Sequence, residues 1–103
     1  MNNLFTQKKS ADLFKALADE TRLKILHSLF EKEKCVMDIL EELHLPQPLV
    51  SHHLKILKTV GLVDSYRQGH KICYSLHPEV RKNLSETKQE TLDLGCCEVK
   101  FKV

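Results

Sequence analysis

Residues 47–61 read QPLVSHHLKILKTVG and carry the clearest structural pattern in the chain. Placed at 100° per residue, these side chains separate into two faces of a helix. One arc is apolar and consists of Leu49, Val50, Leu54, Ile56, Leu57 and Val60. Pro48 is compatible only with a first helical turn, where no backbone donor is needed, and Gly61 is a typical end. The stretch therefore predicts an amphipathic helix from about Gln47 to Val60.

The opposite arc of this helix spans about 140° and consists mainly of polar side chains that can contact base edges and phosphates. Its members are Gln47, Pro48, Ser51, His52, Lys55, Lys58 and Thr59. His53 falls within the apolar arc. We therefore expect His52 to face outward and His53 to be packed or hydrogen-bonded in the core.

Helical spacing continues upstream of this stretch. Apolar residues predict a first helix over 10–18, a second helix that is capped by Asp19, and a short third helix over 35–43. The segment His44-Leu45-Pro46 ends the third helix, because the residue before a proline resists helical geometry.

The period changes after Gly61. Residues 62–66 and 71–76 read as two short strands, and Gly69 lies in the turn between them. A last helix is predicted from Pro78 to about Leu94, with Gly95 at its end. The predicted fold is mainly α with a β-hairpin wing: a winged helix-turn-helix in the order α-α-α-α-β-β-α.

The length of 103 residues suits one domain, which we expect over 10–95, with a flexible N-terminal segment at 1–9 and a C-terminal tail at 96–103. Sixteen Lys and Arg against 14 Asp and Glu leave a net charge of +2, too small for histone-like coating of nucleic acid. No apolar run approaches the roughly 18 residues of a membrane span, and the polar N-terminus argues against a secretory signal. We expect a cytoplasmic protein without a membrane partner.

Local charge is more informative than net charge. Residues 46–72 carry four Lys or Arg against Asp64 alone, whereas residues 31–45 carry five acids against two lysines. A basic helix and a basic hairpin after an acidic helix predict that the helix enters the DNA major groove and the hairpin reaches along the backbone. Two alternatives remain: the lysines form the solvated face of an ordinary helix, or the domain binds another protein and never touches DNA.

Three motifs in this order resemble the ArsR/SmtB family of metal-responsive winged-helix repressors. Residues 17–26, LADETRLKIL, are similar to the family pattern ALADxTRLxIL. Residues 47–57, followed by Gly61-Leu62-Val63, are similar to its recognition helix, and residues 67–69 through 74–76 to its wing. The resemblance covers about Leu13 to Pro78. It implies a homodimer, joined through the first and last helices, that represses transcription until an inducer binds.

A twofold dimer presents two recognition helices one DNA turn apart, about 34 Å, so the expected partner is double-stranded DNA with an inverted-repeat operator. Base or nearby phosphate contacts are expected from Ser51, His52 and Lys55, with Gln47 at the start of the helix. Phosphate contacts are expected from Lys58, Arg67 and Lys71, and DNA binding requires no cofactor. A weak stripe of Val80, Leu84, Thr87, Thr91 and Leu94 fits either the dimer interface or the intramolecular core.

The four cysteines are Cys35, Cys73, Cys96 and Cys97. In a reducing compartment they are expected to be thiols, metal ligands or redox sensors rather than a disulfide framework. Many family members carry a Cys-Val-Cys-Asp box, but this sequence has Cys35-Val36-Met37-Asp38, so a two-thiolate site within that helix is missing. The family's zinc site between the last helices needs histidines, and residues 79–103 contain none.

The adjacent Cys96 and Cys97 are the expected inducer site. Neighbouring Cα atoms are about 3.8 Å apart, too close for an unstrained disulfide between them. Two soft ligands on one short segment suit a thiophilic ion, and Cys35 as a third thiolate would complete a pocket for As(III) or Sb(III). Cys73, in a predicted strand, is expected to be structural or incidental.

Several other readings of the thiols stay open. One is a thiol-redox or persulfide sensor in which Cys35 bonds to Cys96 or Cys97. Another is a site for Cd(II) or Pb(II) with Met37 or Asp38 as an added ligand, and a third is a regulator with no small inducer. A small thiol enzyme is disfavoured, because no motif places a general base or a cofactor fingerprint beside the pair.

Overall fold

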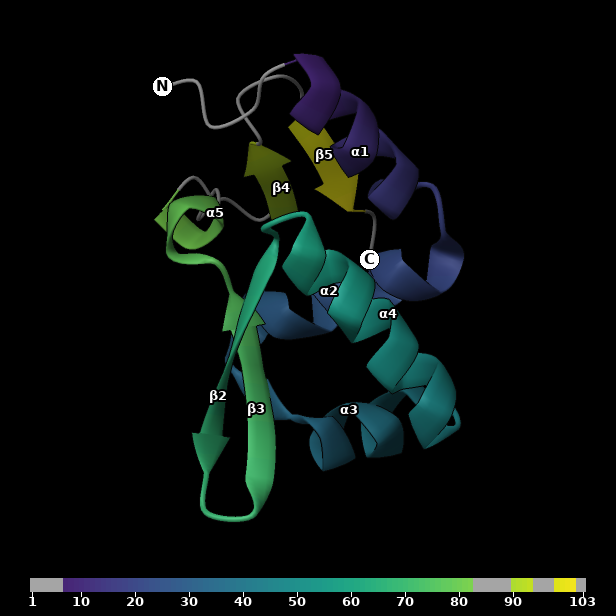
Figure 1. Cartoon of the computed structure of the whole chain (residues 1–103), viewed down its shortest axis with the longest axis vertical. Coiled ribbons are helices and arrows are strands. Elements are labelled where there is room, and N and C mark those ends of the chain that lie inside the picture. Colours follow the sequence, from purple (N-terminus) through teal and green to yellow (C-terminus); the bar gives the residue numbers. More distant parts are fainter. Residues whose placement is uncertain (1–6, 83–89, 94–97, 102–103) are drawn as a thin grey trace.

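The computed structural model describes residues 7–82, 90–93 and 98–101 as a helical body with a projecting hairpin (Figure 1). The elements in chain order are α1 Gln7–Leu17, α2 Glu20–Glu31, β1 Lys34–Cys35, α3 Val36–Leu43, α4 Gln47–Thr59, β2 Val63–Gln68, β3 Lys71–Leu76, α5 Pro78–Lys82, β4 Glu90–Asp93 and β5 Glu98–Phe101. Strands β2 and β3 extend past α3 as a long hairpin. The predicted winged helix-turn-helix is confirmed, and α1 begins at Gln7, a little before the expected residue 10.

The wing is the outer part of a three-stranded antiparallel sheet in the order β1-β3-β2. The short strand β1 was not predicted, because two residues are too few to show a period. It pairs Lys34 with Tyr74 and Cys35 with Cys73, and Cys73 also lies opposite Tyr66 of β2. The wing is therefore attached to the segment that leads directly into α3.

The core lies where α1, α2, α3 and α4 meet the base of the wing. Its largest fully buried side chains are Leu13, Ile25, Leu26, Leu29, Ile39, Leu54, Leu57, Leu62, Val50 and Val63. The apolar arc of α4 supplies three of these, as its spacing predicted. The buried arc is narrower than expected, because Leu49 is 37% exposed and Ile56 is half-buried.

A side-chain cap and two residues with positive φ set the ends of α2, α3 and α4. Asp19 caps α2, as predicted, by accepting a hydrogen bond of 3.0 Å from the backbone N–H of Arg22. His44 adopts a left-handed conformation with φ of 55°, which ends α3. Gly61 has φ of 83°, where a residue without a Cβ atom avoids steric cost, and it follows the end of α4.

The predicted last helix, from Pro78 to about Leu94, is wrong at residues 90–93. Helix α5 is described only to Lys82, and residues 90–93 form β4, which pairs with β5 in the register Leu92↔Val99. Residues 98–101 alternate polar and apolar side chains, which favours a strand, and the β-branched Thr91 weakens the helical alternative. The tail predicted at 96–103 therefore includes a strand, whose Val99 packs against the core.

Within the described ranges, no helix is both long and apolar enough to cross a membrane.

A buried lysine fastens β1 to the helices. Lys34 is 8% exposed, and its ammonium group donates to Oε1 of Glu42 in α3 at 2.6 Å and to Oγ of Ser28 in α2 at 3.0 Å. The Ser28 hydroxyl also donates to Glu42 at 3.0 Å. The hydrogen bond from Lys34 is the main cause that lowers the pKa of Glu42. This cluster fixes where α3 starts relative to α2.

We predict that Glu42→Gln destabilises the fold by about 1 kcal/mol, because the buried Lys34 loses its anionic partner. Glu41→Gln is the matched control: Glu41 is the exposed neighbour, and its replacement should change stability by less than about 0.5 kcal/mol. Urea unfolding at pH 7, with equal m-values, measures the difference. Equal midpoints for the two variants would contradict the role given to the cluster.

Candidate nucleic-acid interface

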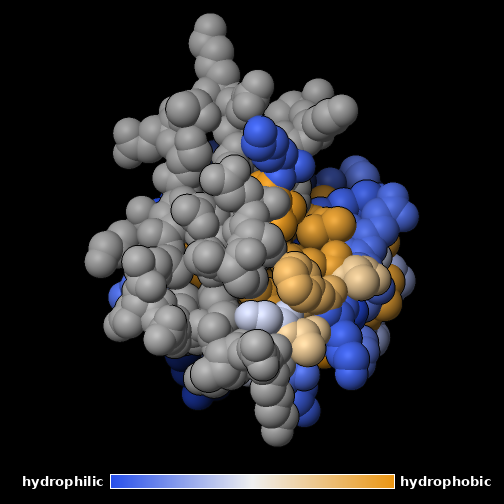
Figure 2. Space-filling model, turned by 90° about the horizontal axis from the view of Figure 1, so that it is seen from above, coloured by the Kyte–Doolittle hydropathy of each residue, from blue (hydrophilic) through white to orange (hydrophobic). Residues whose placement is uncertain are grey.

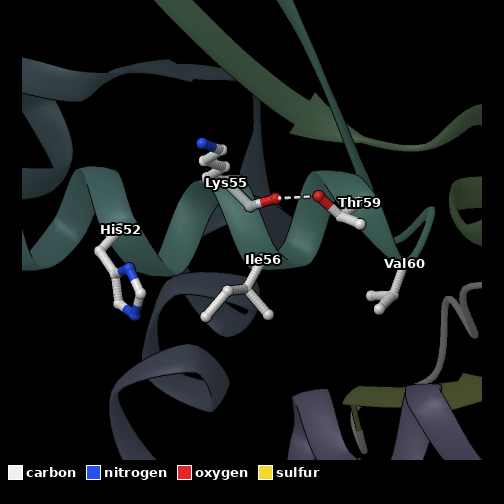
Figure 3. Close-up of a pocket in the computed structure, with 5 residues that line it drawn as sticks. All are labelled: His52, Lys55, Ile56, Thr59 and Val60. Carbon is white, nitrogen blue, oxygen red and sulfur yellow. Dashed lines mark hydrogen bonds between the residues drawn. The ribbon is translucent and has the colours of Figure 1, made fainter.

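The outward face of α4 carries the side chains predicted to contact DNA. All of these residues are exposed: Gln47, Ser51, His52, Lys55 and Lys58. Lys55 projects to one side of the helix, whereas His52, Ile56 and Val60 project to another (Figure 3). These residues and Thr59 line a hollow of about 320 Å³ along the helix. His52 therefore lies at the edge of the polar face, where it borders apolar surface.

Lys58 connects the end of α4 to the wing. Its ammonium group donates a hydrogen bond of 2.7 Å to the hydroxyl of Ser65 in β2. This cation is held at the junction of helix and hairpin, where its charge can act on DNA beside either element. The sequence pattern contained no signal for the Ser65 contact.

The tip of the wing carries the other two predicted contacts. Arg67 and Lys71 are exposed on either side of the turn. Gln68 and Lys71 are the last paired residues of β2 and β3 before the turn. Gly69 in the turn has φ of 65°, a conformation that favours glycine. The structure thus puts both cations at the end of the hairpin, away from the helical body.

His53 lies on the buried side of α4, as predicted. It is 7% exposed, and its Nδ1 atom lies 3.1 Å from Nη1 of Arg22 in α2. A guanidinium group only donates hydrogen bonds, so Nδ1 must accept, and the ring proton of a neutral imidazole is then on Nε2. Nε2 faces Oδ1 of Asp19 at 4.0 Å.

Burial lowers the pKa of His53, because the charged imidazolium loses hydration. The carboxylate of Asp19 opposes this shift, whereas the charge of Arg22 and the neighbouring His52 add to it. The pKa of Asp19 is itself lowered, first by the hydrogen bond from the backbone of Arg22. Burial therefore favours the neutral form of the His53 ring.

Arg22 is a structural residue to which the sequence patterns assigned no role. Its Nε donates to the carbonyl of Ala16 at 2.6 Å and its Nη2 to that of Lys15 at 3.2 Å, both at the end of α1. Because it also bonds to His53, one side chain links α1, α2 and α4. The only available signal was its place in the family-like motif at 17–26.

The structure corrects the predicted cysteine partnerships. Cys35 forms a disulfide with Cys73, a pairing that the sequence did not predict, and Cys73 is therefore not incidental. In this state the sulfur of Cys35 is committed to that bond and is not a thiolate ligand. The sequence missed the pair because β1, which sets Cys35 opposite Cys73, was not predicted.

Cys96 and Cys97 lie outside the described residues. In the ranges 7–82, 90–93 and 98–101, no group of three or more His, Cys, Asp or Glu is arranged to hold a metal ion.

The fold and its exposed basic surface define a winged helix-turn-helix protein. A family model for bacterial regulatory proteins of the arsR family matches residues 19–65. The chain is 35% identical over 91 residues to the arsenical resistance operon repressor of Staphylococcus xylosus, an alignment covering 86% of this chain and 88% of that protein. This chain belongs to the ArsR family, a family of regulators rather than enzymes, as its motifs predicted.

Two further similarities agree with this assignment. The chain is 45% identical over 67 residues to the transcriptional repressor SmtB of Mycobacterium tuberculosis strain CDC 1551 / Oshkosh, covering 65% of this chain and 50% of that one. It therefore spans about half the length of that relative. Its structure is similar to HlyU from Vibrio cholerae N16961, with a TM-score of 0.67, 36% identity, and coverage of 73% and 83% of the two chains.

We predict that acid weakens the attachment of α4 through His53. Because burial lowers its folded pKa, the unfolded chain takes up a proton first as the pH falls below 6.5. The contribution of His53 to stability is fully present above pH 6.5 and is lost between 6.5 and the lower folded pKa. Urea unfolding at several pH values should show a smaller loss over this window in His53→Gln than in the parent.

His52→Gln is the matched control for that series, since His52 is the exposed neighbour on the same helix. It should keep the acid loss of the parent chain. Identical pH profiles for the parent and His53→Gln would show that the Arg22–His53 contact carries no protonation-linked stability.

We predict that Lys58→Ala weakens binding to all duplex sequences alike and reduces the slope of log K against log salt by about 1. The loss of one phosphate-facing charge causes the effect. Fluorescence anisotropy at four salt concentrations measures it. Lys24→Ala, which removes an exposed lysine of α2 that pairs with Glu20, should leave the slope unchanged. A change in sequence preference with Lys58→Ala would refute a phosphate contact.

Proposed function

We propose that this protein is a homodimeric transcriptional repressor of the cytoplasm that binds an inverted-repeat DNA operator and is released by a thiophilic inducer. The observation that carries the proposal is the exposed basic face of α4 beside a wing with Arg67 and Lys71 at its tip. Family membership supports the same class of function.

In this proposal α4 enters the major groove. Ser51, His52 and Lys55 contact base edges or nearby phosphates, with Gln47 at the N-terminal end of the helix. Lys58, Arg67 and Lys71 neutralise phosphates. Helix α3, which precedes the turn, is acidic, whereas α4, which follows it, is basic. The electrostatic potential of the helix-turn-helix therefore favours insertion of α4 rather than α3 into the groove.

A dimer would cover apolar surface on α1. Phe14 of α1 is 51% exposed, an unusual exposure for a large aromatic side chain in a helix that packs against a core. Figure 2, which looks down on the end of the molecule where α1 lies, shows apolar surface beside the atoms drawn in grey. A twofold contact through α1 and the last helical segment would set the two α4 helices about one DNA turn apart.

For the inducer, we propose an arsenite-class metalloid, As(III) or Sb(III), bound by the thiolates of Cys96 and Cys97. Cys35 joins them only after reduction of its bond to Cys73. The relative from Staphylococcus xylosus is named an arsenical resistance operon repressor, which supports this choice. Cd(II) and Pb(II) are the competing soft ions.

A second candidate is a thiol-redox or persulfide-sensing repressor of the same fold. The Cys35–Cys73 disulfide specifically favours redox chemistry in this chain. The two candidates differ in which cysteines respond, and so they can be separated by substitution.

We predict that Cys96→Ser with Cys97→Ser abolishes arsenite-induced release and leaves operator binding intact. The experiment uses reduced protein, a labelled duplex from the promoter of its own gene, and fluorescence anisotropy while arsenite, cadmium or a persulfide donor is added. The parent should release DNA at low micromolar arsenite. Arsenite release that persists in the double variant would overturn the metalloid site, and release by the persulfide donor alone would favour the redox candidate.

A further inference from the structure

We propose that Cys35 and Cys73 are a dithiol–disulfide switch that joins the wing to the helix-turn-helix, and that a low-molecular-weight disulfide oxidises it. The inference rests on the proposed DNA-binding function but is independent of Cys96 and Cys97. The switch would change how rigidly the wing is attached to the helix-turn-helix. It does not require an inducer that releases the protein from DNA.

The backbone brings the two cysteines together by strand pairing. Cys35 ends β1 and Cys73 lies in the central strand β3, directly opposite it. Both strands are fixed on their other sides: Lys34 is anchored to Glu42 and Ser28, and Cys73 lies opposite Tyr66 of β2. Strand pairing therefore keeps the reduced sulfur atoms near enough to bond again, which favours reversible closure.

The covalent loop closed by this bond encloses the whole proposed DNA-binding surface. Cys35 and Cys73 are 38 positions apart, and α3, α4 and β2 lie between them. All residues proposed to touch DNA fall inside the loop: Gln47, Ser51, His52, Lys55, Lys58, Arg67 and Lys71. Cross-linking the two ends ties β3, and with it the wing, to the N-cap residue of α3.

The two cysteines differ in their access to solvent. Cys73 is 1% exposed, and its sulfur lies 3.7 Å from Oε1 of Gln68. Cys35 is half-buried at the N-terminal end of α3, where its backbone N–H donates to Asp38 at 3.1 Å. A small oxidant therefore reaches Cys35 first, and Cys73 acts as the resolving thiol.

The reaction is thiol–disulfide exchange in two steps. The Cys35 thiolate attacks one sulfur of a small disulfide RSSR, forming a mixed disulfide and releasing one RS⁻. The Cys73 thiolate then attacks the sulfur of Cys35, forming the intramolecular bond and releasing the second RS⁻. The protein loses two electrons and two protons, RSSR gains both electrons, and the protons end on two RSH molecules.

Oxidation should tighten DNA binding. Without the bond, β1 is held to β3 by two residue pairs, Lys34↔Tyr74 and Cys35↔Cys73, so the wing can shift against α3. The bond removes that motion. The oxidised protein therefore loses less conformational entropy when the helix and the wing bind DNA together. We expect the oxidised protein to bind about 3- to 10-fold more tightly than the reduced protein.

The test compares the full chain after treatment with glutathione disulfide or with dithiothreitol, using the promoter duplex and anisotropy. Peptide mass mapping should find Cys35 linked to Cys73 only in the oxidised sample. The melting temperature of that sample should also be higher, because a closed loop restricts the unfolded chain. Cys96→Ser with Cys97→Ser should keep the redox difference, and Cys73→Ser should lose it.

Two results would overturn the switch. One is that no peptide linking Cys35 to Cys73 forms under oxidation; the other is that it forms while DNA affinity stays the same. If Cys73→Ser does not fold, the parent protein that is reduced and alkylated at Cys35 replaces it and should bind like the reduced form. Absence of DNA binding in both redox states would instead refute the proposed function, so the two failures are distinguishable.

Discussion

The contact between Arg22 and His53 is the constraint on which the position of the DNA-facing helix depends. The guanidinium group bonds to two carbonyls at the end of α1 and to the ring of His53, which lies on the buried side of α4. Because Arg22 is held by the α2 backbone, whose first turn is capped by Asp19, three helices share one polar junction. The ring must remain neutral to accept this hydrogen bond, and burial favours that state.

A second junction holds the other side of the helix-turn-helix. Lys34 ties β1 to α2 and α3, and the adjacent Cys35 bonds to Cys73 in the wing. Lys58 adds a contact from the end of α4 to β2. Specific polar and covalent contacts, together with the apolar core, therefore hold the elements of the helix-turn-helix and the wing. These elements carry the polar face of α4 and the cations of the wing.

The sequence predicted the elements that have a strong period or clear end signals, and missed those that depend on partners far away. The two faces of α4, the cap at Asp19 and the buried His53 followed from helical spacing and local chemistry. Strand β1 has two residues and exists through its pairing with β3, so neither it nor the Cys35–Cys73 bond had a local signal. Residues 90–93 form a strand where the sequence predicted a helix. The apolar stripe of that predicted helix was weak, and the strand depends on pairing with β5, which lies in the predicted tail.

An NMR titration of the uniformly ¹⁵N-labelled chain with the duplex from its own promoter tests directly whether α4 and the wing contact DNA. If α4 reads DNA and the wing follows the backbone, the largest amide shifts should fall in residues 47–59 and 67–71, and they should shrink as salt is raised. Shifts confined to the acidic helix α3, or no shifts at any salt concentration, would contradict DNA binding through α4 and the wing.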